Sequence, residues 1–210
     1  MLAFPEYVKI FVGLLAIANP LAAVPIFITL TAGLHSRDRA SVSNIVAATV
    51  CTILLCSLIL GDGLLKLFGI SIYSFRVGGG ILLLLMSVSM LHAKLSPVVQ
   101  TKDEAEESKE KDSVAVVPLS IPLIAGPGAI STVIIDAHRG TGIAHYLIIG
   151  GVILALSGIL WVVLRLSPLI SERISTTGIN VFTRIMGLIL AAIAVEFIAN
   201  GLKGLFPGLA

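Results

Sequence analysis

Long stretches without a charged residue are the feature that most constrains this chain of 210 residues. A helix needs about 20 apolar residues to cross a lipid bilayer. No Lys, Arg, Asp or Glu occurs in residues 10–36, 40–61, 77–93, 113–135 and 140–164. These stretches predict five spans, and residues 179–202 predict a sixth, interrupted by Arg184 and Glu196. Only 12% of the chain is charged, against about 25% in soluble domains, which favours an all-α membrane protein in a lipid bilayer.

A run of charged residues, TKDEAEESKEKD at 101–112, divides the chain near its midpoint. It contains three Lys and six acidic residues and no aromatic residue, a composition typical of a solvated linker. We therefore expect a first three-helix unit at residues 1–95, a charged linker at 96–112 and a second three-helix unit at 113–210.

The two predicted halves share a spacing of prolines. Pro20 and Pro25 match Pro122 and Pro127 at a constant offset of 102 residues, and SFRVGGGILL aligns later with FTRIMGLILA. Because three spans is an odd number, a duplicated second half enters the membrane in the opposite orientation. The sequence thus predicts two inverted three-helix repeats, an arrangement common in secondary transporters.

Lys and Arg are distributed unevenly between the two predicted membrane faces. Nine lie on the side of the loops that join spans one to two, three to four and five to six, and five lie on the other side. By the positive-inside rule the first side is cytoplasmic. We therefore expect a multi-pass protein of a cell inner or plasma membrane, with residues 101–112 in the cytoplasm and both termini outside.

Prolines inside a membrane helix free backbone hydrogen-bonding groups in the lipid interior. Each freed carbonyl has to meet protein, water or a ligand. We therefore expect broken first and fourth helices, with unwound backbone at both prolines of each pair. A helix that begins in mid-membrane presents unpaired N–H groups and a positive dipole end, and one that ends there presents carbonyls. Two such breaks facing each other predict a binding site for a small zwitterion.

The residues at the two breaks are the predicted binding residues. Asn19 offers an amide that both donates and accepts hydrogen bonds, and the glycines beside Pro127 allow a ligand to approach the backbone closely. Glu196, an acid inside a span, is predicted to support or couple transport. Asn44 is predicted either to do the same or only to bridge helices. The predicted substrate-binding residues are Asn19, Pro20, Pro25, Pro122, Gly126, Pro127 and Gly128.

Known catalytic and metal-binding motifs do not occur in the sequence. It contains no HExxH, GxSxG or Walker motif and no CxxC pair, so we expect neither an enzyme nor a bound cofactor or metal. A net charge of +2 does not indicate a nucleic-acid partner. The sequence leaves open the coupling ion, H⁺ or Na⁺, and the state of any homo-oligomer.

Four stretches carry a family resemblance: NPLAAVPIF at 19–27, PLSIPLIAGPGAIS at 118–131, TGINVFTRIMGLIL at 177–190 and VEFI at 195–198. With them the chain resembles, over essentially its whole length, the MarC family of integral membrane proteins, which includes the SnatA-type transporters. The resemblance implies a six-span secondary transporter of small neutral amino acids such as glycine, alanine and serine. Two alternatives stay open: an exporter of another small polar solute or ion, and a non-transporting membrane protein whose breaks are only kinks.

Overall fold

The computed structural model describes residues 2–31, 33–92 and 124–209, and its described elements are all helices. This confirms the predicted all-α class. The predicted linker at 96–112 lies outside the described residues, so the domain boundaries stay a prediction. The elements are α1 (Phe4–Ala18), α2 (Pro20–Leu30), α3 (Ser36–Leu67), α4 (Ile72–Leu91), α6 (Pro127–Ala137), α7 (Ile143–Arg165), α8 (Ser167–Arg173), α9 (Thr176–Leu205) and the short 3-10 helix η2 (Pro207–Leu209).

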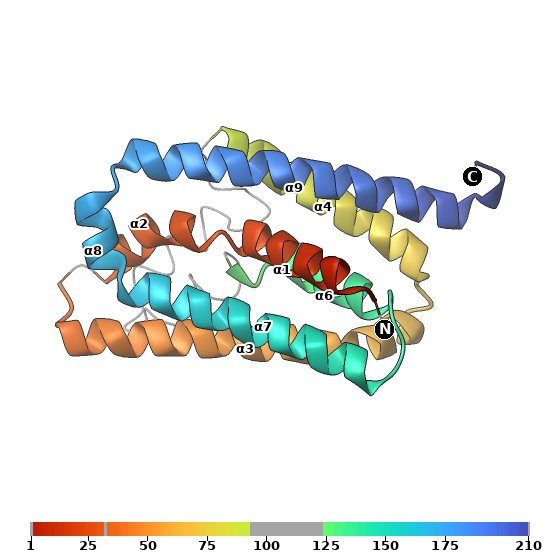
Figure 1. The fold of residues 1–210 in the computed structure, drawn as a ribbon, viewed down its shortest axis with the longest axis horizontal. Coiled ribbons are helices and arrows are strands. Elements are labelled where there is room, and N and C mark those ends of the chain that lie inside the picture. Colours follow the sequence, from red (N-terminus) through yellow and green to blue (C-terminus); the bar gives the residue numbers. More distant parts are fainter. Residues whose placement is uncertain (1, 32, 93–123, 210) are drawn as a thin grey trace.

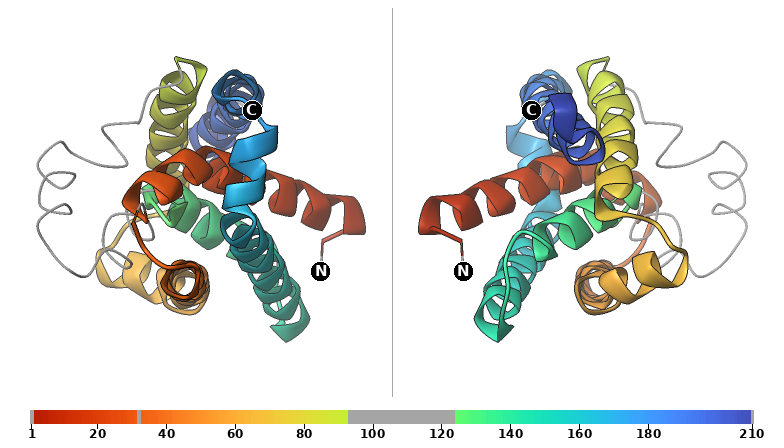
Figure 2. Two further views of the ribbon diagram at one scale, coloured as in Figure 1. Left: turned by 90° about the vertical axis from the view of Figure 1, so that its left-hand side faces the viewer. Right: turned by 90° about the vertical axis from the view of Figure 1, so that its right-hand side faces the viewer.

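The helices α1 and α2 run through the middle of the bundle (Figure 1). On one side α3 packs against α7, and on the other α4 packs against α9. The end-on views place α6 in the central layer, between these two pairs (Figure 2). Burial agrees with this arrangement, because the most apolar part of α1–α2 is 61% buried and that of every other candidate span is 33% or less.

Both chain termini lie at one end of the bundle, where α1, α4 and α7 begin and α3, α6 and α9 end (Figure 1). We call this the terminal end. The turn from α3 to α4 at this end follows from local sequence. Gly69 has a φ of 65° and its N–H bonds the carbonyl of Lys66 at 3.1 Å, which closes α3 with a left-handed residue. The hydroxyl of Ser71 then accepts a hydrogen bond from the N–H of Ser74 at 3.0 Å and caps α4.

Among the described residues, five helical segments are long and apolar enough to cross a membrane. The helix α6 has 11 residues, about 16 Å at 1.5 Å per residue, which is roughly half of the hydrocarbon core. Residues 113–123, which belong to the predicted fourth span, lie outside the described residues, so a count of six stays a prediction. The five segments are Phe4–Leu30, Ser36–Leu67, Ile72–Leu91, Ile143–Arg165 and Thr177–Leu205.

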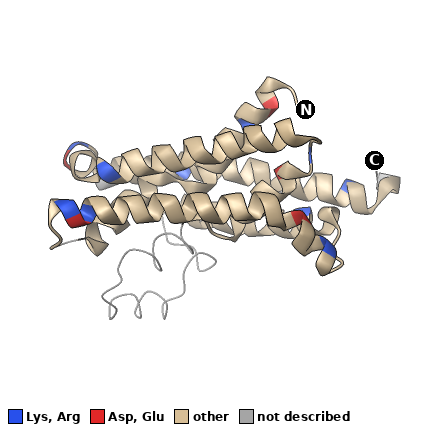
Figure 3. Cartoon of the chain, turned by 90° about the horizontal axis from the view of Figure 1, so that it is seen from below, with Lys and Arg blue, Asp and Glu red and all other residues tan. Residues whose placement is uncertain are grey.

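The outer surface of the helices is apolar. Charged residues lie mainly toward the two ends of the bundle, and long uncharged stretches separate them (Figure 3). This distribution suits a bilayer, because the hydrocarbon interior accepts apolar side chains and the charges reach the interfaces. Large apolar side chains that are more than half exposed include Ile59, Leu67, Leu147, Leu154, Leu188 and Val195.

The first helix is broken near Pro20, as predicted, but the expectation of unwound backbone at Pro25 is wrong. Pro25 lies inside α2, which is continuous from Pro20 to Leu30. A proline removes one backbone hydrogen bond, and the rest of α2 keeps its helical geometry around that gap. Pro25 is also exposed, so it faces away from the core.

Each long helix of the first half packs against its counterpart in the second half, α3 with α7 and α4 with α9. In the α4–α9 contact, glycines bring the two backbones close together. A Cβ added to Gly80 would lie 2.9 Å from the carbonyl oxygen of Ala194, and one added to Gly201 would lie 2.9 Å from that of Tyr73. Such small-residue contacts are typical of membrane helices. A two-fold relation between the halves stays a prediction.

We expect Gly80→Ala to lower the stability of the protein, although alanine is the better helix former. The new methyl group would lie 2.7 Å from Cγ1 of Ile198 and 2.9 Å from a backbone oxygen, and overpacking of this kind costs about 1–3 kcal/mol. Gly78→Ala is the matched control, because nothing lies within 4 Å of its added Cβ. Thermal unfolding in detergent should show a lower Tm for Gly80→Ala only. Equal Tm values for the two variants would show that the contact between α4 and α9 accommodates the added methyl group without a loss of stability.

Candidate functional site

The break between α1 and α2 lies at Asn19, in the centre of the bundle (Figure 1). Asn19 has left-handed backbone angles, φ 38° and ψ 65°, and its N–H bonds the carbonyl of Leu15 at 3.0 Å. Asparagine is one of the few L-residues that adopt this conformation at low cost. Pro20 then begins α2, where its fixed φ suits the first helical position. The Asn-Pro dipeptide therefore ends one helix and starts the next.

The side chain of Asn19 is buried and only partly hydrogen-bonded. The residue is 6% exposed, and its Nδ2 donates a long hydrogen bond of 3.4 Å to the hydroxyl of Thr183 on α9. Its Oδ1 has no hydrogen-bond partner among the described residues. Since an unsatisfied buried polar atom costs about 1–3 kcal/mol, this oxygen marks a place where a water or a ligand is expected to bind.

The described residues of the second predicted break lie at the start of α6. Gly126 is not helical, Pro127 is the first residue of α6, and no side chain caps the N-terminus of this helix. A Cβ added to Gly128 would lie 3.6 Å from Ile17, two residues before Asn19, so this start packs beside the first break. The same Cβ would lie 2.8 Å from Sδ of Met86, which gives Gly128 a role in close packing. Contact between Gly128 and a ligand stays a prediction.

Two further sequence-predicted residues lie elsewhere. The Oδ1 of Asn44, on the exposed side of α3, accepts a hydrogen bond of 2.7 Å from Nε1 of Trp161 on α7. This contact matches the interpretation of Asn44 as a residue that bridges helices, and a coupling role for it stays a prediction. Pro122 lies outside the described residues.

A polar cavity of about 120 Å³ lies at the terminal end of the bundle. Helices α1, α4, α6 and α9 and the residue Arg139 after α6 form its walls. At roughly 30 Å³ per water, the cavity has room for about four water molecules or one small solute. Besides Thr132 and Asn200, its polar lining residues are all charged: Glu6, Lys9, Arg76, Asp136, Arg139 and Glu196.

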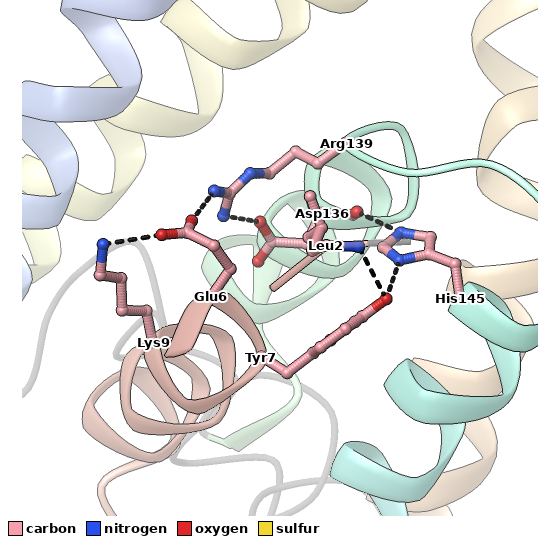
Figure 4. A network of polar contacts seen from close by, with 7 residues as sticks. All are labelled: Leu2, Glu6, Tyr7, Lys9, Asp136, Arg139 and His145. Carbon is pink, nitrogen blue, oxygen red and sulfur yellow. Dashed lines mark hydrogen bonds and ion pairs between the residues drawn. The ribbon is translucent and has the colours of Figure 1, made fainter. Parts of the chain in front are cut away.

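Four of these charged residues form one continuous network (Figure 4). Lys9 pairs with Glu6 at 2.8 Å, Arg139 pairs with Glu6, and the second arm of Arg139 pairs with Asp136 at 3.2 Å. Burial disfavours the charged form of Arg139, but the charges of Asp136 and Glu6 outweigh that effect and raise the pKa of the guanidinium above its ordinary value. Arg139 thus stays charged and joins α1 to the end of α6.

A second set of hydrogen bonds, through His145 and Tyr7, holds the backbone of Asp136 at the end of α6 (Figure 4). Nε2 of the buried His145 lies 3.0 Å from the carbonyl oxygen of Asp136, and its Nδ1 lies 2.9 Å from the hydroxyl of Tyr7. Since a carbonyl only accepts, Nε2 carries the proton and donates. Tyr7 in turn accepts a hydrogen bond from the N–H of Leu2 at 3.3 Å. These contacts fix α1, α6 and α7 to one another at the terminal end.

A family model described as "MarC family integral membrane protein" matches residues 4–206. The chain belongs to the MarC family. It is thereby an integral, multi-pass membrane protein, in agreement with its five long apolar helices.

Relatives of this MarC chain match it over nearly its full length. The UPF0056 membrane protein YhcE of Escherichia coli is 45% identical over 98% of this chain and 96% of its own. The UPF0056 membrane protein YvbG of Bacillus subtilis is 42% identical over 97% of each chain. A UPF0056 membrane protein of Methanocaldococcus jannaschii is 38% identical over 94% of this chain and 96% of its own. No solved structure matches the chain.

Among the sequence-predicted residues of this MarC protein, Gly128 packs beside Ile17, two residues before the break at Asn19, and Glu196 lines the polar cavity instead. The charged network around that cavity was not predicted from the sequence. The one signal in the sequence was that Asp136 directly follows one uncharged stretch and Arg139 directly precedes the next, which by itself marks only the limits of two spans.

Proposed function

We propose that this MarC family member is a secondary transporter of small neutral amino acids such as glycine, alanine and serine, and that it works by alternating access. The observation that carries the proposal is the buried amide of Asn19, whose Oδ1 is unpaired among the described residues at a left-handed helix break. In a membrane protein such a break is tolerated where protein, water or a ligand satisfies the freed groups.

The break offers groups of both signs to a zwitterion. The helix α2 begins at this break and α6 begins beside α1, both without a side-chain cap, so each N-terminus offers partial positive charge to a carboxylate. The C-terminal end of α1 and the unpaired Oδ1 of Asn19 present acceptors to an ammonium group. Discontinuous helices in secondary transporters bind substrates in this way.

Glu196 and the orientation in the membrane complete the proposal. Glu196 lies in α9 and lines the polar cavity, from which it supports or couples transport with H⁺ or Na⁺. The terminal end faces the outside, so both termini are external. An impermeant thiol reagent added to intact cells should then label a cysteine at position 2 in a variant that lacks Cys51 and Cys56. Labelling only after the cells are opened would show that the protein has the opposite orientation, with both termini inside.

Counterflow in proteoliposomes tests the transport proposal. Vesicles that contain the purified protein and unlabelled glycine should accumulate radiolabelled glycine, alanine and serine, and empty vesicles should not. Exchange of another small polar solute without these three would favour the alternative of a different exporter. A protein that exchanges no solute at all would be a non-transporting membrane protein.

A further inference from the structure

The polar cavity contains equal numbers of positive and negative side chains, and they are not all used in ion pairs. Its cations are Lys9, Arg76 and Arg139, and its anions are Glu6, Asp136 and Glu196. Four of the six belong to the network from Lys9 to Asp136. Within the described residues, Arg76 and Glu196 form no ion pair within 4.0 Å. The cavity thus has one charge of each sign outside these ion pairs, although the charge of Asp136 also acts on Arg76 from a longer distance.

Arg76 lies in the first turns of α4 and is only partly buried. Its Nε is inaccessible to solvent and has no hydrogen-bond partner among the described residues. A guanidinium presents several donors in a fixed plane, which matches the two oxygens of a carboxylate. Because Arg76 lines the cavity and forms no ion pair within 4.0 Å among the described residues, its guanidinium is available to a carboxylate that enters the cavity.

Glu196 provides the opposite charge from α9. The residue is exposed and lines the same cavity, beside Asn200 one turn later. It lies inside one of the apolar candidate spans, where an unpaired carboxylate is costly unless water or a cation meets it. An ammonium group would satisfy this carboxylate with a charge-assisted hydrogen bond.

We propose that the polar cavity is an outer binding site for a small zwitterion, with the carboxylate on Arg76 and the ammonium on Glu196. This inference rests on the proposed function for its choice of solute, and it adds a second site at the terminal end to the central one at Asn19. The cavity volume of about 120 Å³ suits a solute of a few heavy atoms. The four network residues form the wall and leave the two free charges to the ligand.

The site is tested by protection of a cysteine from labelling. Asn200 is exposed and lines the cavity, so Asn200→Cys is labelled by an impermeant thiol reagent in a protein that lacks Cys51 and Cys56. The background also carries Asn19→Ala, so that binding at the central break does not contribute. Glycine should slow the labelling in a saturable manner. Acetate and methylamine, which carry one charge each, should need concentrations at least tenfold higher for the same protection.

Substitutions of the two free charges identify the ligand contacts. Arg76→Gln and Glu196→Gln should each raise the half-protecting glycine concentration at least tenfold, and Arg76→Lys should restore part of the loss. The matched controls are Arg173→Gln and Glu172→Gln, exposed residues of α8 at the opposite end, which should leave protection unchanged. Each variant is first checked for a monodisperse elution profile, and Arg76→Lys serves where Arg76→Gln does not fold.

Three results would overturn the proposal: no protection by glycine, equal protection by acetate, which would indicate a plain anion site, or full protection in both charge variants. Its failure is separable from failure of the transport proposal, because protection reports on the terminal end alone. Counterflow without protection would keep the transporter and remove the outer site. Protection without counterflow would keep the outer site and remove the transporter.

Discussion

Weaker glycine binding at the central helix break is the expected result of replacing Asn19 with alanine. The substitution removes the Oδ1 acceptor, which is unpaired among the described residues, and the Nδ2 donor, which makes only a long hydrogen bond to Thr183. An unsatisfied partner left on a bound zwitterion costs about 1–3 kcal/mol, or roughly 5- to 150-fold in affinity. Equilibrium binding of radiolabelled glycine and alanine, compared with and without Asn19→Ala in purified protein that carries Arg76→Gln to weaken the outer site, measures this change. Counterflow by the same variant should fall in parallel.

Asn19→Gly distinguishes the effect of losing the side-chain amide from the effect of straining the left-handed backbone. Alanine in the left-handed conformation costs about 1–2 kcal/mol, whereas glycine adopts it freely. Glycine at this position should therefore keep the break but still lose binding. Wild-type affinity in Asn19→Gly would contradict a role for the amide as a ligand contact. Asn44→Ala removes the hydrogen bond to Trp161 and tests whether the substrate binds near Asn44 instead. A larger loss of affinity in Asn44→Ala than in Asn19→Ala would place the binding site near Asn44 and not at the helix break.

The first helix break could be predicted from the sequence because it depends on neighbouring residues. Asn19 and Pro20 determine the local backbone by themselves, through the left-handed tolerance of one and the missing N–H of the other. The same reasoning failed at Pro25. A proline spacing predicts where a hydrogen bond is lost, but the remaining bonds of α2 and the exposed position of Pro25 decide that the helix continues.

The polar cavity could not be predicted in the same way, because its residues meet only in the folded chain. Glu6 and Arg139 are 133 positions apart, and in the sequence Arg139 marks only the limit of an uncharged stretch. Glu196 could be singled out because it interrupts an apolar span, where an acid is costly. Its position beside Arg76 depends on the packing of α4 against α9, which charge counts do not contain.

The second large effect is expected at Arg139, because Asp136 depends on it. Asp136 is 3% exposed, and Arg139 is its ion-pair partner within the described residues. Removing one partner of a buried pair is costly because the other charge stays buried alone, at about 3–5 kcal/mol. Arg139 is itself about one-third exposed, so we expect the lower limit, roughly 3 kcal/mol, for Arg139→Gln. Unfolding of the purified protein in detergent measures the loss.

A double-mutant cycle shows whether the loss comes from the pair. Asp136→Asn removes the stranded charge, so the double variant Arg139→Gln/Asp136→Asn should be more stable than Arg139→Gln alone, with a coupling energy of about 0.5–3 kcal/mol. Lys66→Gln is the control, because Lys66 and Asp62 form an exposed pair within α3 that is expected to contribute little. Additive losses would show that Asp136 needs no counterion. The network would then order the wall of the cavity without stabilising the contact between α1 and α6.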